Sequence, residues 1–244
     1  MGAILTLGEF GYLIWRLITN LQFVFRDRNR VTYQLDHVGV NSIPLVLLIG
    51  LFSGAIIAWQ AAYQFKGMIS LNVLGGQVVR VILMEMAPVL TALVISGRIG
   101  ASMTAEIGSM KITEQIDALR TMSIDPVRYI VLPRFIGLTF MMPILTLFSI
   151  LIAVLGAFLV SNYFLDITYE VFFHSVRDFF AVSDLAGGLI KATIFGMTIA
   201  LIGCFMGLKT DGGAVGLGQS TIQSFVICAI SILAGDFLLW IILF

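Results

Sequence analysis

Charged residues are scarce in this sequence, and their scarcity indicates which solvent surrounds the chain. Of the 244 residues, 11% are charged and 59% are hydrophobic, whereas soluble domains carry roughly 25% charged and 45–50% apolar residues. One core cannot bury this excess of apolar surface, so we expect much of the chain to face lipid. The formal net charge of zero argues against a nucleic-acid partner, because proteins that bind nucleic acids present basic surfaces.

Cysteine and histidine are also rare, with two of each. Cys204 and Cys228 lie inside apolar runs of different segments, which favours small buried side chains over a disulfide or a metal pair. His37 and His174 are far apart and lack the spacing of metal ligands. The sequence therefore predicts no metal site.

Long apolar runs take the place of charge. A membrane-spanning helix needs about 20 mostly apolar residues, and lipid admits helices but not open strands. We therefore predict an all-α membrane protein with five transmembrane helices, forming a single domain over residues 1–244 with its five-span core at 41–244. The five apolar runs are residues 43–65, 78–103, 135–164, 185–208 and 224–244.

The N-terminal stretch, residues 4–25, has a different pattern. Its polar residues recur on one stripe at helical spacing: Glu9, Arg16, Asn20 and Asp27. This pattern is typical of a helix that lies in the membrane interface, with Tyr12 and Trp15 at headgroup level; a sixth span is the alternative. The stretch lacks the basic start and cleavage site of a signal peptide. Residues 1–40 are thus predicted to be an interfacial helix and a connector.

Lysine and arginine are distributed unevenly between the two sides of the predicted bundle. One side has only Lys66, Arg80 and Arg177. The other side has Arg16, Arg26, Arg28, Arg30, Lys111, Arg120, Arg128, Arg134 and Lys209. Basic loops stay in the cytoplasm, so we predict a cytoplasmic N-terminus and an external loop at 166–184, whose amphipathic pattern indicates a short helix on the membrane.

The loop between spans two and three carries a helical pattern of its own. Ile112, Ile116 and Leu119 recur at the spacing of one helix face. Asp125 suits the N-cap of the next helix and Pro126 its first position. We predict a short amphipathic cytoplasmic helix, which is either a connector resting on the bilayer or a docking element for a cytoplasmic partner.

A long, ordered series of motifs runs through the middle of the sequence: EMAPVL at 85–90, GRIGA at 97–101, AEIGSM at 105–110, EQIDAL at 114–119, DP at 125–126 and PR at 133–134. It continues with Lys191, FG at 195–196, GLG at 216–218 and Asp236. These motifs together resemble the MlaE-type (YrbE-like) permease family of ABC lipid transporters. The resemblance covers nearly the whole chain and departs at Met86-Ala87, where the family usually has Leu-Gly.

The resemblance implies a function and partners that composition does not show. The family's permeases work as homodimers in the bacterial inner membrane, each docking one cytoplasmic ABC ATPase through the helix between spans two and three. An external MCE-domain protein exchanges phospholipid with them, and some systems add a STAS-domain protein. The coupling residues expected here are Glu106, Met110, Lys111, Glu114, Gln115, Asp117 and Leu119.

The chain itself is predicted not to be an enzyme. Leu208 separates Gly207 from Lys209-Thr210, which does not match a phosphate-binding loop. No cofactor is expected in this chain, since ATP and Mg²⁺ belong to the partner ATPase.

Polar residues inside the spans need partners, because a charge at the bilayer centre costs roughly 2.5–3.5 kcal/mol or more. Lys191 either snorkels to the interface or pairs with Asp236 in span five, and Arg98 snorkels or braces the docking helix. Glu85 makes an interhelical hydrogen bond or contacts a lipid headgroup.

A lipid cavity needs an apolar wall and a polar mouth. The outer ends of spans one and two offer both, although ordinary packing is the alternative. The candidate lipid-binding residues are Ile57, Gln64, Phe65, Met68 and Glu85.

Two other classes of function fit the sequence less well than a permease. An ion-coupled secondary transporter or channel usually shows inverted repeats or matched broken helices, and the sequence has no internal repeat. An intramembrane enzyme needs a cluster of nucleophile, base or metal ligands within the spans, which the sequence lacks.

Overall fold

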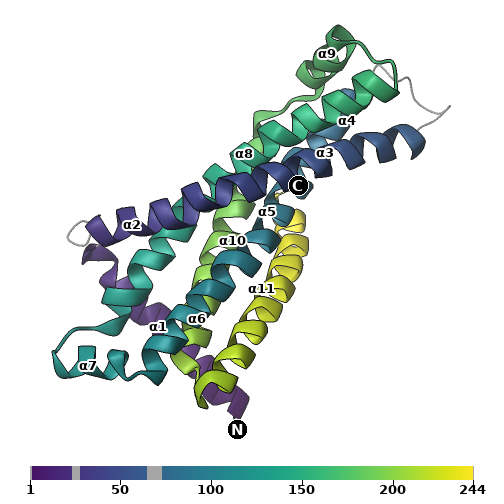
Figure 1. Cartoon of the computed structure of the whole chain (residues 1–244). Coiled ribbons are helices and arrows are strands. Elements are labelled where there is room, and N and C mark those ends of the chain that lie inside the picture. Colours follow the sequence, from purple (N-terminus) through teal and green to yellow (C-terminus); the bar gives the residue numbers. More distant parts are fainter. Residues whose placement is uncertain (1, 24–27, 65–72, 244) are drawn as a thin grey trace.

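The computed structural model of the chain describes residues 2–23, 28–64 and 73–243, and every regular element in these ranges is a helix (Figure 1). Most elements join end to end into longer rods. The N-terminal half contains α1 (Gly2–Asn20), η1 (Leu21–Phe23), α2 (Arg28–Gly39), η2 (Val40–Ser42), α3 (Ile43–Gln64), α4 (Leu74–Val81), η4 (Ile82–Met86), α5 (Ala87–Ile95), η5 (Ser96–Gly100) and α6 (Ala101–Ile112). The remainder contains α7 (Gln115–Thr121), η6 (Val127–Val131), α8 (Leu132–Phe164), α9 (Tyr169–Phe179), α10 (Val182–Lys209) and α11 (Gly213–Leu243).

Within the described residues, five helical rods are long and apolar enough to cross a membrane, which confirms the predicted number of spans. They are Arg28–Gln64, Leu74–Ile112, Val127–Phe164, Val182–Lys209 and Gly213–Leu243. The helix α1 is not one of them, and its position in the membrane interface stays a prediction.

The rods extend further than the apolar runs from which the spans are predicted. The first begins at Arg28 rather than near residue 43, because α2 and η2 continue into α3 without a break in the helix. Residues 28–42 are more polar than lipid allows, so hydropathy alone could not assign them to the rod. The helix α2 packs instead against α8.

The helices α7 and α9 lie at opposite ends of the bundle (Figure 1). We name these the α7 end and the α9 end. The opposite placement agrees with the prediction that the loop between spans two and three and the loop at 166–184 lie on different sides of the membrane. The helix α9 forms as expected within the second loop and packs against α4, while its position on the membrane stays a prediction. Phe172 of α9 is fully buried, and a Cβ at Gly75 would lie 2.8 Å from its carbonyl oxygen.

Glycines bring neighbouring spans into close contact. A Cβ at Gly54 of α3 would collide with the carbonyl oxygen of Ala153 in α8. A Cβ at Gly203 of α10 would lie 3.1 Å from the carbonyl oxygen of Gly100. The small-residue pairs at 50 and 54 and at 203 and 207 therefore serve close packing between spans inside the chain.

The second span changes helical pitch twice. The π-helical turns η4 and η5 interrupt it on either side of α5, and such turns are rare and frequent at functional sites. Glu85 lies in the first and Arg98 in the second. These two charged residues thus sit where the helix is widened.

Candidate functional site

A buried ion cluster joins three of the five spans. Lys191 of α10 donates from Nζ to Oε1 of Glu85 in η4 and to Oδ1 of Asp236 in α11, both at 2.9 Å. The Lys191 side chain is 0% exposed, against 29% for Glu85 and 18% for Asp236. The ammonium also lies 5.1 Å from the ring centre of Trp240. We call Glu85, Lys191 and Asp236 the ion triad.

The approach of α10 to span two makes this burial possible. A Cβ at Gly188 would collide with the carbonyl oxygen of Leu83, so the two backbones almost touch one turn before Lys191. An isolated ammonium at this depth would be expensive, and its two carboxylate partners offset that cost. Removing the ammonium, or removing both carboxylates, would leave a charge without compensation inside the bundle.

The structure confirms the predicted pairing of Lys191 with Asp236 and adds Glu85 to it. Of the two alternatives for Glu85, the interhelical bond is present. Arg98 donates from its guanidinium to the backbone carbonyl of Asn41 in η2. It therefore contacts the first span, and the two alternatives for Arg98, snorkelling to the interface or bracing the docking helix, stay predictions.

The predicted lipid-binding residues are not gathered into one site within the described chain. Ile57 is partly buried against the cluster formed by α3, α4, α8 and α9. Gln64 is exposed at the last residue of α3, while Glu85 is bound to Lys191. Phe65 and Met68 lie outside the described residues. A hollow of about 630 Å³ does open between α3 and α8, and its lining comes from other residues, including Trp59, Tyr63 and Phe164.

The predicted cytoplasmic helix forms at the α7 end, but it begins later than its apolar pattern indicated. The helix α6 ends at Ile112, and Glu114 adopts a left-handed backbone with φ of 59° before α7 starts. Ile112 therefore belongs to α6 and is 36% exposed, whereas Ile116 is 3% exposed. Leu119 packs against the same apolar cluster as Ile116, which includes Leu13 of α1.

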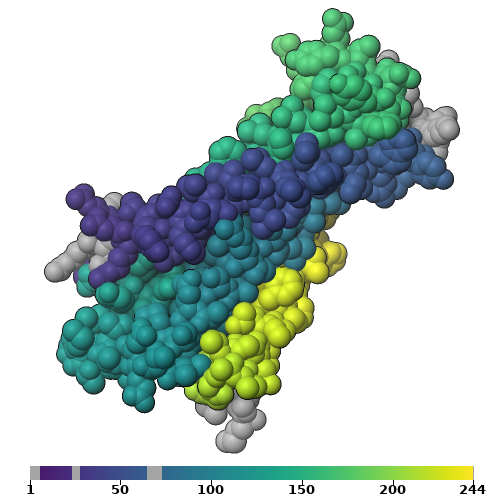
Figure 2. Space-filling view, viewed as in Figure 1, coloured from purple at the N-terminus to yellow at the C-terminus, as the bar shows by residue number. Residues whose placement is uncertain are grey.

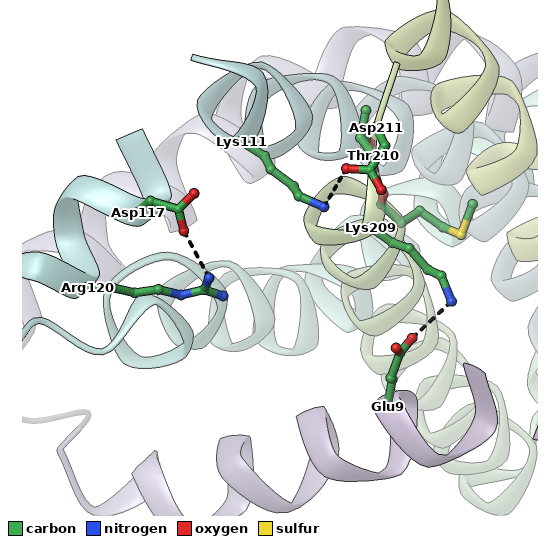
Figure 3. A network of polar contacts seen from close by, with 8 residues as sticks. Glu9, Lys111, Asp117, Arg120, Lys209, Thr210 and Asp211 are labelled. Carbon is green, nitrogen blue, oxygen red and sulfur yellow. Dashed lines mark hydrogen bonds and ion pairs between the residues drawn. The ribbon is translucent and has the colours of Figure 1, made fainter. Parts of the chain in front are cut away.

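The seven predicted coupling residues divide into two groups. Glu114, Gln115 and Asp117 are exposed around the start of α7. The others hold the α7 end together: Glu106 pairs with Arg134 of α8 at 2.9 Å, Lys111 pairs with Asp211 at 2.9 Å, and Met110 and Leu119 are partly buried. Figure 3 shows Lys111 reaching Asp211, and Asp117 pairing with Arg120 along α7.

A second link at this end was not predicted. Asp125 accepts the Val127 N–H at 2.9 Å through Oδ1, which confirms its predicted capping role. Its other oxygen pairs with Arg16 at 3.0 Å and accepts a hydrogen bond from Asn20 at 3.1 Å. Helix α1 is thereby tied to the start of the third span. The polar stripe on α1 is the sequence feature that contains Arg16 and Asn20, but its pattern predicts a helix in the membrane interface and does not indicate a contact with Asp125.

Residues 31–242 match the model of the family described as Permease MlaE. The chain belongs to this family. It is 39% identical to a probable ABC transporter permease protein of Rickettsia typhi over 86% of this chain and 82% of that protein. A Synechocystis protein of the same description is 38% identical over 87% of this chain and 81% of its own length. One from Pyropia yezoensis is 34% identical over 93% and 86%.

The predicted resemblance to the MlaE permeases is thus confirmed, and the chain is an ABC transporter permease with several membrane spans. The ion triad and the α7 end both lie inside the matched region of the MlaE permease model. Helix α1 lies outside it.

Proposed function

We propose that this chain is the permease subunit of an ABC-type phospholipid transporter in the bacterial inner membrane. Membership of the MlaE permease family is the observation that carries this proposal. The chain works as a homodimer with a cytoplasmic N-terminus and exchanges phospholipid with an external MCE-domain protein. A separate ABC ATPase, in some systems with a STAS-domain protein, binds ATP and Mg²⁺ and drives the cycle.

The α7 end is the site where the ATPase docks. Glu114, Gln115 and Asp117 present polar groups outward, while Ile116 anchors the opposite face of α7 in the bundle. A force on α7 reaches span two through the two residues 113–114. It reaches span three through the capped turn at Asp125, and the pair of Glu106 with Arg134 makes both spans respond together.

The ion triad couples the movement of span two to spans four and five. Span two carries Glu85, so a rotation or tilt of this span changes the distance from Glu85 to Lys191 and Asp236. Ion pairs in low dielectric are sensitive to such changes. The triad therefore holds one arrangement of the spans until the ATPase supplies the energy to leave it.

Lipid enters at the α9 end, which the proposed orientation places outside. These candidate residues do not form one site within the described part of a single copy, so the cavity is one that two copies share. Ile57, Gln64, Phe65 and Met68 contribute its wall and rim, and Glu85 retains a partly exposed carboxylate for a headgroup. A second copy of the chain closes the cavity. Helix α11 is available for this contact, because only Ser224, Cys228 and Ile232 of this helix are buried within the chain, and Figure 2 shows α11 along the outside of the bundle.

Charge reversal on α7 tests the docking site. Glu114→Lys together with Asp117→Lys should detach or uncouple the ATPase, because both carboxylates face outward beside each other. Glu170→Lys, an exposed acid in the first turn of α9, is the matched control at the other end. Affinity purification in mild detergent measures ATPase recovery, and the purified chain alone should hydrolyse no ATP. Full ATPase recovery and full lipid transport by the double reversal would rule out this docking site.

A further inference from the structure

An apolar groove runs between α1 and the two C-terminal spans. Its volume is about 420 Å³, within the roughly 300–1,000 Å³ range of ligand pockets. The polar contributions are three hydroxyl groups, from Thr6, Thr198 and Ser231. The remaining lining is hydrocarbon, aromatic or thioether: Leu7, Phe10, Leu201, Ile202, Phe205, Met206 and Ile227. Such a surface favours an extended aliphatic chain over a polar ligand.

A cleft of about 380 Å³ with charged side chains on its border adjoins the groove, and Phe205 lines both. Four cationic side chains and two carboxylates border the cleft: Arg16, Lys111, Arg120 and Lys209, with Glu9 and Asp211. The carboxylate partners of Arg16 and Arg120, which are Asp125 and Asp117, do not line it. Each of the four cations is paired with a carboxylate, but only two of these carboxylates line the cleft, so four cationic and two anionic groups face the space inside it.

Lys209 stands where the groove and the cleft meet. It is the last residue of α10, and its Nζ donates to Oε2 of Glu9 and to Oγ1 of Thr6, both at 2.9 Å. Figure 3 shows this ammonium between α1 and the end of α10. Both members of the ion pair are open to solvent, with 43% of the Lys209 side chain and 59% of that of Glu9 exposed. An anion in the cleft therefore has access to Lys209 without dismantling a buried pair.

We propose that an anionic phospholipid of the membrane leaflet at the α7 end binds here, with an acyl chain in the groove and its phosphate beside Lys209 and Lys111. Charge complementarity and the continuity of groove and cleft select this occupant. A spanning helix from another protein would fill the groove but would leave the cationic cleft unmatched. A soluble anion would fill the cleft but not the groove.

The site differs from the lipid cavity of the proposed transport function. It lies at the α7 end, is formed largely by α1 and α10, and holds its lipid without ATP or partner proteins. The bound lipid fixes α1 against the bundle beside the segment that docks the ATPase. A test with the isolated chain therefore succeeds or fails independently of transport.

Photolabelling in nanodiscs tests the proposal with the full chain. One set of nanodiscs contains a phosphatidylglycerol with a diazirine in its acyl chain, and a second contains the matching phosphatidylcholine at the same mole fraction. A single added ion contact near a surface contributes up to about 1 kcal/mol, so phosphatidylglycerol should label residues 6–10 and 198–206 roughly two- to five-fold more than phosphatidylcholine. Phe140, an exposed aromatic on α8, should be labelled equally by both lipids.

Two substitutions separate a phosphate contact from a structural role. Lys209→Gln removes the ammonium and should abolish the preference for phosphatidylglycerol. Glu9→Gln breaks the same ion pair but keeps the ammonium, so the preference should persist or increase. Equal labelling by both lipids, labelling no greater than at Phe140, or crosslinks to a polypeptide would overturn the proposal. Equal loss of preference in both variants would do so too, because it would show that Lys209 only holds α1 in place.

Discussion

Replacing Lys191 with methionine removes the cation of the ion triad while keeping an unbranched side chain. Glu85 and Asp236 then face each other inside the bundle without an opposite charge. Breaking a buried ion pair by removing one partner costs about 3–5 kcal/mol. The two carboxylates are 29% and 18% exposed and recover part of their solvation, so we place the loss near the lower end, at about 3 kcal/mol.

Thermal unfolding of the purified chain in detergent measures this loss. For a chain of this size, about 3 kcal/mol corresponds to a fall in Tm of roughly 6–12 °C. Arg120→Gln is the control, because the Arg120–Asp117 pair is about two-thirds exposed on both sides and such pairs contribute roughly 0–1 kcal/mol. Removing both carboxylate charges with Glu85→Gln and Asp236→Asn should recover most of the stability lost in Lys191→Met. A Tm for Lys191→Met equal to that of the control would show that the triad does not hold the three spans together.

Three further predictions follow from the packing and the termini of the spans. Gly54→Ala should lower the free energy of unfolding by about 1–3 kcal/mol because it overpacks the α3–α8 contact. Gly8→Ala, with open space around it, is the control and should be neutral or stabilising. Chemical denaturation of the two variants compares their free energies of unfolding. Asp125→Ala should remove an N-cap worth about 0.5–2 kcal/mol and release α1, seen as faster hydrogen exchange there with unchanged exchange in α9. In cysteine-free chains, a cysteine at Ser109 should resist an impermeant thiol reagent in intact cells while one at His174 reacts, and the reverse would invert the orientation.

The choice of His174 shows what the structure adds to a correct prediction. The sequence places residues 166–184 in one loop, and any position in it looks equally suitable for labelling. In the structure Ser175 is 4% exposed and its Oγ accepts the Gly76 N–H at 2.9 Å. A cysteine there would stay unlabelled on either side of the membrane. His174 points outward, with 78% of its side chain exposed.

The five spans were predictable because lipid imposes a length and a composition on each helix independently of its neighbours. The capping role of Asp125 was predictable for a related reason, since a cap depends on residues within one turn. Both are local properties: the hydropathy pattern indicates the spans, and the residue types at fixed offsets indicate the cap.

The pairings between spans were harder to predict because they depend on how helices rotate against each other. Lys191 and Asp236 were matched by elimination among few charges, but Glu85 was not assigned to them. Arg134 and Glu106 lie in a charged stretch that offered several partners. The positive φ of Glu114 also escaped prediction, since glutamate carries no signal for a left-handed backbone, and this break explains why Ile112 is not part of α7.

The most direct test of the account is ATP-driven phospholipid movement by the complex that this chain assembles. The complex would be purified through the chain in mild detergent and reconstituted into liposomes with a fluorescent phospholipid. The account predicts that an ABC ATPase co-purifies, that phospholipid moves only with ATP and Mg²⁺, and that the double reversal Glu114→Lys and Asp117→Lys abolishes the movement while Glu170→Lys does not. Lipid movement that ignores ATP, or a complex without an ATPase, would contradict it.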